Sequence, residues 1–265
     1  MDEPFYQPLG NDLWGATVHT TGPWDARFQH GGPPSALLGR AIERCNPRED
    51  MFIARLEVDI LGAVPVGELT LRSRVLRPGR SVELVEAALS AGGREVARAQ
   101  AWRVLRTPEN IAPRQSPTPA APTAPVAPPM ATTSTFSVAE GWIDGYLSAV
   151  EWRFTAGEFG QPGPATAWTR LRHPIVPDET PSPLQRVLAV ADSGNGISSE
   201  LDLNNWHFIN PELTVHLHRE AVGEWICVEA QTAISPGGAG LATSVLSDAA
   251  GPIGVGAQSL LIAPR

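Results

Sequence analysis

Apolar and polar positions along the chain follow two periods, and each period is typical of one kind of element. In residues 30–45 and 181–196 the apolar positions recur every three to four residues, which predicts a helix with one apolar face in each segment. Pro33 and Pro34 suit the entrance of the first helix, and the turn Gly194–Gly196 is expected to end the second. The two apolar faces consist of Leu37, Leu38, Ala41, Ile42 and Cys45, and of Leu184, Val187, Leu188 and Ala191.

The other regular segments alternate between apolar and polar residues, which predicts strands. Two short runs precede each predicted helix and four longer runs follow it. We expect the short strands over 13–21, 23–29, 149–155 and 165–173. We expect the long strands over 52–64, 67–79, 81–93 and 94–106 in the first half, and over 212–222, 223–238, 240–251 and 252–264 in the second.

This repeated order of elements indicates an internal duplication. The spacing agrees, because Val58 and Gln100 are 42 residues apart, Val215 and Gln258 are 43 apart, and each glutamine follows an alanine. Each half is therefore predicted to be ββα followed by a meander of four strands. The fold class is α+β, with a curved antiparallel sheet wrapped around one central helix in each half.

A proline-rich segment separates the two halves. From Thr107 to Thr135 prolines recur every two to five residues and aromatic residues are absent, which is typical of a semi-extended spacer without a core. We therefore expect an N-terminal domain over 1–106, a linker over 107–135 and a C-terminal domain over 136–265. Each half is long enough to form a core of its own.

Composition removes several classes of function. The net charge is −8 and all 20 basic residues are arginine, so a nucleic-acid partner is not expected and chemistry that needs a lysine amine is excluded. Two cysteines, Cys45 and Cys227, are too few for a disulfide framework and fit a reducing compartment. The chain begins without a signal-peptide pattern and has no run long enough to span a membrane, so we expect a cytoplasmic location.

Familiar catalytic and cofactor motifs are missing from the sequence. It lacks G-x-S-x-G, a G-x-G-x-x-G after a strand, H-E-x-x-H and C-x-x-C, which leaves nucleophile-elbow, dinucleotide, zinc-protease and thiol-redox functions without support. His216 and His218 alternate on a predicted strand and are potential metal ligands. Since no carboxylate stands at matching spacing, a polar strand face is the favoured interpretation and no metal is expected.

Three polar residues in the second half are candidates for chemistry. Asp192 follows the apolar run of the second helix, where a carboxylate is unusual, although an acid capping a helix end is the structural alternative. Gln258 lies among small and apolar residues in the last strand, where a buried amide needs partners, and Gln100 suggests a purely structural alternative. Asn210 precedes Pro211, which alone would suggest a turn.

Together these side chains suit one reaction. A carboxylate with two neutral polar groups can hold a water molecule against a carbonyl carbon and remove its proton, which is general-base hydrolysis. The developing oxyanion then needs donors, and a helix N-terminus with small residues offers backbone N–H groups. Gly31 and Gly32, directly before the first helix, fit this role, with a tight turn into the helix as the structural alternative.

The sequence resembles the acyl-CoA thioesterase II family, in which two tandem hotdog domains form a double hotdog on one chain. The resemblance covers nearly the whole sequence and is closest to the actinobacterial branch of that family. It rests on FQHGGPPSALLGRAIER in the first half, and on VLAVADSG, NPELTVHLHRE followed by GEW, and AAGPIGVGAQSLLI in the second.

The resemblance implies a catalytic aspartate, a hydroxyl residue and a glutamine at Asp192, Asn210 and Gln258. Asn210 departs from the family pattern because an amide replaces the hydroxyl, and Thr214 is the alternative if the alignment is shifted. The implied reaction is hydrolysis of a fatty acyl-CoA to free acid and coenzyme A, with no cofactor beyond water. The resemblance and the exposed sheet edges imply a homo-oligomer, a dimer of double hotdogs.

Further expectations concern substrate contacts and alternative functions. The acyl chain is expected in an apolar channel between the halves, and two alternative activities are an enoyl-CoA hydratase and a non-catalytic acyl-CoA-binding protein. The hydratase is disfavoured because the nearest histidine downstream of Asp192 is His207. Channel walls are expected from Leu37, Leu38, Leu188 and Trp206, and coenzyme A phosphate contacts from Arg55, Arg72 and Arg219.

Overall fold

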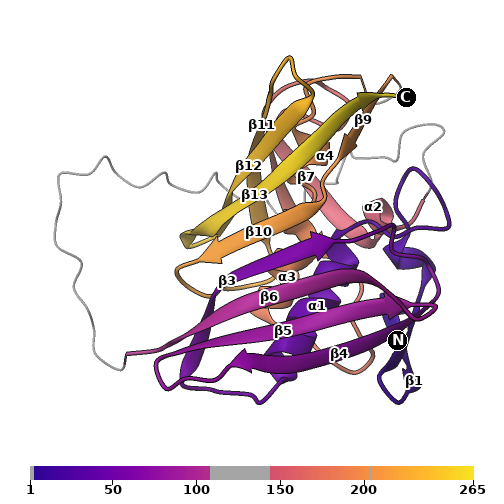
Figure 1. The fold of residues 1–265 in the computed structure, drawn as a ribbon. Coiled ribbons are helices and arrows are strands. Elements are labelled where there is room, and N and C mark those ends of the chain that lie inside the picture. Colours follow the sequence, from indigo (N-terminus) through magenta and orange to yellow (C-terminus); the bar gives the residue numbers. More distant parts are fainter. Residues whose placement is uncertain (1–2, 108–143, 203–204) are drawn as a thin grey trace, which may run out of the picture.

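All described strands belong to one antiparallel sheet (Figure 1). The computed structural model describes residues 3–107, 144–202 and 205–265. The first half contains β1 (Tyr6–Gly10), β2 (Leu13–Ala16), a 3₁₀ turn (Val18–Thr20), α1 (Gly32–Arg44), β3 (Met51–Ile60), β4 (Glu68–Arg77), β5 (Val82–Ala91) and β6 (Arg94–Leu105). The second contains α2 (Tyr146–Ala149), β7 (Val150–Ala156), β8 (Ala165–Leu171), α3 (Pro183–Ala191), α4 (Gly194–Ile197), β9 (Trp206–Ile209), β10 (Glu212–Leu217), β11 (Ile226–Ile234), β12 (Ala239–Asp248) and β13 (Gly251–Pro264).

The strand order confirms the duplication. From edge to edge the sheet runs β1, β2, β4, β5, β6, β3, β10, β13, β12, β11, β8 and β7, with β9 added on β13. The two halves meet where β3 pairs with β10, and Leu56 lies opposite Val215 while Val58 lies opposite Leu213. Away from this seam, each half repeats the same order of strands. In Figure 1 the indigo-to-magenta half and the orange-to-yellow half continue into one curved sheet.

The predicted four-stranded meander is wrong in both halves. Only β4, β5 and β6, and likewise β11, β12 and β13, form a meander, because the strand that follows each helix pairs with the last strand of its half. This arrangement places β3 and β10 at the centre of the sheet. Alternation of apolar residues identifies a strand but does not select its neighbours, so the pairing was not accessible from the pattern.

Three shorter predictions also need correction. The strand expected over 23–29 is an irregular segment with isolated bridges at its end, and the Asp25 carboxylate accepts the Arg27 N–H in a tight turn there. The strand expected over 13–21 ends at Ala16, where the 3₁₀ turn follows. The turn expected at Gly194–Gly196 is instead the start of the short helix α4.

The linker expected over 107–135 lies, apart from Thr107, outside the described residues.

The helices α1 and α3 pack against each other on the concave side of the sheet. α3 starts at Ser182, whose hydroxyl oxygen accepts the Gln185 N–H, and Pro183 fits its first turn because that position needs no N–H donor. α1 is buried along all but its last two residues. Their close approach depends on Gly39, where a Cβ would overlap the Leu188 side chain.

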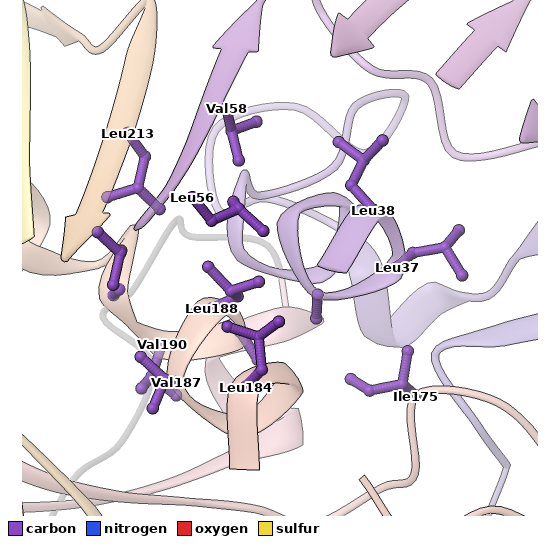
Figure 2. Close-up of a cluster of buried hydrophobic side chains, with 14 of the residues drawn as sticks. Leu37, Leu38, Leu56, Val58, Ile175, Leu184, Val187, Leu188, Val190 and Leu213 are labelled. Atoms are coloured by element: carbon purple, nitrogen blue, oxygen red, sulfur yellow. The ribbon is translucent and has the colours of Figure 1, made fainter. Parts of the chain in front are cut away.

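A single large apolar cluster fills the space between the helices and the central strands. Figure 2 shows Leu188 of α3 next to Leu56 of β3, in the same cluster as the α1 leucines, Val58 of β3 and Leu213 of β10. Fully burying one such leucine contributes roughly 1.5–3 kcal/mol to stability. The core therefore spans both halves and fixes the helix ends at which the candidate site lies. None of the helices in the described part of the chain is long and apolar enough to cross a bilayer.

Candidate active site

Asp192, Asn210 and Gln258 lie together at the C-terminal end of α3. The Asp192 side chain is almost completely buried, and its Oδ1 accepts a hydrogen bond from Asn210 Nδ2 at 2.7 Å. Gln258 Nε2 donates to the same oxygen at 3.3 Å and to the Asp192 main-chain oxygen at 3.0 Å. Asp192 is thus in direct contact with both of the other residues that were selected from the sequence.

Each side chain is delivered by a different element. Asp192 is the C-cap of α3, Asn210 stands between β9 and β10, and Gln258 lies on the face of β13 that looks toward the helices. β10 and β13 are neighbours in the sheet, which brings the start of one strand and the second half of the other beneath the end of α3. Long-range strand pairing therefore assembles the cluster.

Gln258 also holds the chain that follows Asp192. Its Oε1 accepts the Asn195 N–H at 3.0 Å, so the amide binds both sides of the bend between α3 and α4. A Cβ on Gly194 would stand 3.1 Å from the same oxygen, which leaves little room for a side chain there. In this state Gln258 fixes the position of Asp192.

Gln100 is not the counterpart of Gln258. Val58 lies opposite Ala99 and Val215 lies opposite Gly256, so Gln100 is one residue beyond its reference position and Gln258 is two beyond. A shift of one residue turns a side chain to the other face of a sheet. Gln100 accordingly bonds Glu86 on the outer face, so it gives no information about the role of Gln258.

Gly31 and Gly32 bring the entrance of α1 against the end of α3. A Cβ on Gly31 would lie 2.5 Å from Asp192 Oδ2, and a Cβ on Gly32 would overlap the Ala189 main-chain oxygen. Only glycine permits such an approach at both positions. The Gly32 N–H does not point freely into the site, because it donates to His30 Nδ1 at 3.1 Å.

His30 is a member of the cluster that sequence reasoning missed. Its Nδ1 lies 3.4 Å from Asp192 Oδ2, and its ring stacks on Tyr146 at 3.9 Å between centroids. Burial lowers the pKa of His30, although the nearby Asp192 charge acts in the opposite direction. A neutral ring also agrees with the Gly32 contact, since a protonated Nδ1 cannot accept a hydrogen bond.

Tyr146 closes the cluster on the side of α2. Its hydroxyl donates to the Ala189 main-chain oxygen at 2.8 Å and shares a 2.9 Å hydrogen bond with the Ser193 hydroxyl. Burial raises the pKa of Tyr146, and the Asp192 charge adds to that shift. In the sequence, His30 stands directly before the glycine pair and far upstream of Asp192.

The opposite end of the helix pair carries a second carboxylate with different chemistry. Glu43 at the end of α1 accepts hydrogen bonds on both oxygens, from Ser182 Oγ at 2.7 Å and from Gln185 Nε2 at 2.8 Å. Burial raises the pKa of Glu43. A cavity of about 250 Å³ borders this end and includes Leu184 in its lining. Asp192 differs because only Oδ1 is held by amides, whereas Oδ2 faces Gly31 and His30.

Other predicted contacts lie away from the cluster. Thr214 is on the outer face of β10 and bonds Glu212, so it is not beside Asp192. Arg55 pairs with Glu57, Arg72 is exposed on β4, and Arg219 binds Asp248. The proposed channel residues Leu37, Leu38 and Leu188 belong to the closed core, and Trp206 packs on a smaller cluster with Leu260 and Ile262. Within the described residues no group of three His, Cys, Asp or Glu side chains is arranged to hold a metal ion.

Comparisons with known proteins agree with this architecture. The model of the acyl-CoA thioesterase N-terminal domain matches residues 20–104, and that of the C-terminal domain matches residues 119–262. None of the curated proteins matches the chain.

Solved structures of similar fold cover almost the whole chain. Acyl-CoA thioesterase II TesB2 from Mycobacterium marinum is 15% identical with a TM-score of 0.63, and covers 98% of this chain and 95% of its own. The tesB protein from Mycobacterium avium is 15% identical with a TM-score of 0.67, covering 98% and 96%. A hot dog fold protein from Alicyclobacillus acidocaldarius is 13% identical with a TM-score of 0.72, covering 97% and 95%. With family models matched across both of its tandem hotdog halves, the chain belongs to the acyl-CoA thioesterase family.

Proposed function

We propose that this protein hydrolyses acyl-CoA thioesters to a free acid and coenzyme A, with Asp192 as the general base. The observation that carries the proposal is the unequal use of the two carboxylate oxygens. Oδ1 is fixed by Asn210 and Gln258, whereas Oδ2 faces the entrance of α1. A base must be held in place by one side and must offer a lone pair on the other.

The reaction then follows from the geometry of the cluster. Asp192 Oδ2 takes a proton from water while the water oxygen bonds to the thioester carbonyl carbon. The electron pair of the C=O bond moves to oxygen, where backbone N–H groups at Gly31 and Gly32 stabilise the charge. Collapse of the intermediate breaks the C–S bond, and the proton held by Asp192 passes to the thiolate. The proposed chemistry uses water and no cofactor.

Asn210 supports this role although it replaces the hydroxyl residue of the family pattern. Its amide donates to the carboxylate at 2.7 Å, a charge-assisted bond that a threonine or serine hydroxyl would otherwise supply. Its second contact, to the Glu212 main-chain oxygen at 3.4 Å, keeps the amide directed along β10. The substitution is therefore compatible with positioning of the base.

A non-catalytic acyl-CoA-binding protein is the second candidate. The observation in its favour is that two of the expected catalytic groups already bind within the protein. The Gln258 amide is engaged on both of its atoms, and the Gly32 N–H is taken by His30. Such a protein would bind acyl-CoA without turnover. In either case we expect a homo-oligomer formed from copies of the double hotdog.

The decisive experiment measures thiol release from a series of short to long acyl-CoA substrates. We expect turnover by the wild type and a loss of about 10²–10⁴-fold in Asp192→Asn, since this is the range contributed by general bases. Gln258→Ala should also lose turnover because Asp192 loses its anchor. Glu43→Gln makes the same carboxyl-to-amide change at the other helix end, and it should retain turnover in the folded protein.

Both outcomes that contradict the proposal are clear. Turnover that survives in a folded Asp192→Asn variant would remove this residue as the base while leaving hydrolysis intact. Binding of acyl-CoA by the wild type without thiol release on any chain length would favour the non-catalytic protein. Circular dichroism and thermal unfolding of each variant provide the control for folding.

A further inference from the structure

The first turn of α1 has very few backbone donors. Of its first three residues, Pro33 and Pro34 carry no N–H, so Gly32 is the only donor among them. The next N–H, from Ser35, is bonded to the Gly31 main-chain oxygen. A helix N-terminus normally offers several free N–H groups to an anion. Here the first turn of α1 offers an anion a single N–H, that of Gly32, and the capping Gly31 supplies the other donor of the proposed site.

The Gly32 N–H is bound by His30, a side chain that is itself firmly held. The His30 ring stacks on Tyr146, its backbone N–H bonds the Thr20 oxygen at 2.9 Å, and its side chain is only 10% exposed. Its Nδ1 lies 3.1 Å from the Gly32 nitrogen and 3.4 Å from Asp192 Oδ2. Among the described residues, the titratable groups that face the ring are Asp192 from the end of α3 and Tyr146 from α2.

Because of these distances, protonation of His30 Nδ1 decides whether the Gly32 N–H is hydrogen-bonded within the protein or free. Nδ1 accepts the Gly32 N–H only when it carries no proton. In that state Nδ1 and the ionised Oδ2 face each other as two acceptors, so a proton placed between them is attracted by both. Once Nδ1 carries the proton, it donates to Oδ2 and releases the Gly32 N–H.

We propose that His30 is a positioning residue that frees the Gly32 N–H only while negative charge develops on the substrate. The inference rests on the proposed thioester hydrolysis and extends it. As the water oxygen bonds to the carbonyl carbon, its proton passes to Asp192 Oδ2 and on to His30 Nδ1. The protonated Nδ1 donates to Asp192 Oδ2, which already lies 3.4 Å away, and the Gly32 N–H donates to the new oxyanion.

The reaction cycle is completed without a further reactant. When the C–S bond breaks, its electron pair stays on sulfur and the C=O bond re-forms. The proton on Nδ1 returns through Asp192 to the thiolate, which leaves as the thiol. His30 Nδ1 then accepts the Gly32 N–H again, and the donor is protected from water between turnovers.

Two substitutions separate this role from simple packing. His30→Asn keeps an acceptor near the Nδ1 position but cannot carry a proton, so the Gly32 N–H stays occupied. We expect kcat to fall about 10²–10³-fold, the effect of losing one oxyanion donor, with KM within about twofold. His30→Ala leaves a cavity beside Tyr146 and lowers Tm more, yet it frees the donor and should lose less kcat than His30→Asn.

A purely structural histidine would give the reverse order, with kcat following Tm and the alanine variant worse. That order, or wild-type kcat in His30→Asn, would overturn the proposal. A second readout does not need turnover. In ¹⁵N NMR of the wild-type protein, the Gly32 amide and His30 Nδ1 should shift with one common midpoint as pH falls.

The two readouts also separate this inference from the proposed function. If the wild type released no thiol, hydrolysis would be contradicted, while the NMR titration would still decide the link between His30 and Gly32. A Gly32 amide that stays unchanged while His30 titrates would overturn the link even in an active enzyme.

Discussion

At the scale of single residues, the candidate site depends on the absence of side chains as much as on their presence. The entrance of α1 reaches the Asp192 carboxylate because Gly31 carries no Cβ, and the same is true of Gly32 against α3. Polar groups of both halves thereby meet within hydrogen-bonding distance, although they come from distant parts of the sequence. The base and the donors of the proposed reaction could not otherwise act on one carbonyl group.

Gly31→Ala tests this arrangement. The new Cβ would lie 2.5 Å from Asp192 Oδ2, so the carboxylate or the helix entrance must move. We expect a loss of about 1–3 kcal/mol in the free energy of unfolding, as for other overpacked sites, and a larger relative fall in kcat. Gly67→Ala is the matched control, because a Cβ there meets no atom within 4 Å. Equal kinetics for the two variants would contradict the importance of this contact.

At the scale of elements, the contact between α1 and α3 sets the position of the site. Gly39→Ala should destabilise the protein by roughly 1–3 kcal/mol because its Cβ overlaps the Leu188 side chain. Leu188→Ala should cost about 2–5 kcal/mol through the cavity it leaves. In the double variant the cavity accommodates the new methyl group, so urea unfolding should give a combined loss smaller than the sum. Strict additivity would show that the two residues do not share this space.

A second element-scale prediction concerns acid stability of the β12–β13 hairpin. Burial would raise the pKa of Asp248, but the Arg219 guanidinium and the N–H groups of Val222 and Ala250 outweigh it and lower the pKa. A depressed carboxyl pKa contributes stability above the unfolded pKa of about 3.9, and that contribution is lost as pH falls through the folded value. Asp248→Asn should therefore lose stability at pH 7 and much less at pH 3, measured by urea unfolding. An equal loss at both values would contradict this assignment.

Sequence patterns predicted the elements of this fold better than their connections. The two long helices α1 and α3 were predicted because an apolar period of three to four leaves little alternative, although α3 already ends at Ala191 and the short helices α2 and α4 were not predicted. Asp192 was noticeable because it follows the apolar run of α3. The pairing of β3 with β6 and of β10 with β13 was not predicted, because an alternating pattern is the same whichever strand lies beside it. His30 was not predicted because its partner Asp192 is 162 residues away in the sequence, and only the packing of α1 against α3 brings the two side chains together.

At the scale of the whole molecule, exposed apolar residues favour the expected oligomer. Ile209 and Leu261 lie opposite each other on β9 and β13, Leu241 is on the adjacent β12, and all three are about half exposed. Light scattering after gel filtration should give about twice the chain mass of 28.2 kDa. Leu261→Arg should shift the protein toward the monomer, whereas Arg72→Ala, on β4 of the other half, should not. A monomeric wild type would contradict the prediction.

The seam between β3 and β10 also has a consequence for how chains can exchange parts. It joins the halves by backbone hydrogen bonds and buried side chains, and neither kind of contact requires that both halves come from one polypeptide. Two molecules that traded their second halves would rebuild the same seam and the same Asp192–His30 contact in each composite unit. Each unit of such an exchanged pair would contain the complete proposed site, so an activity assay alone would not detect the exchange.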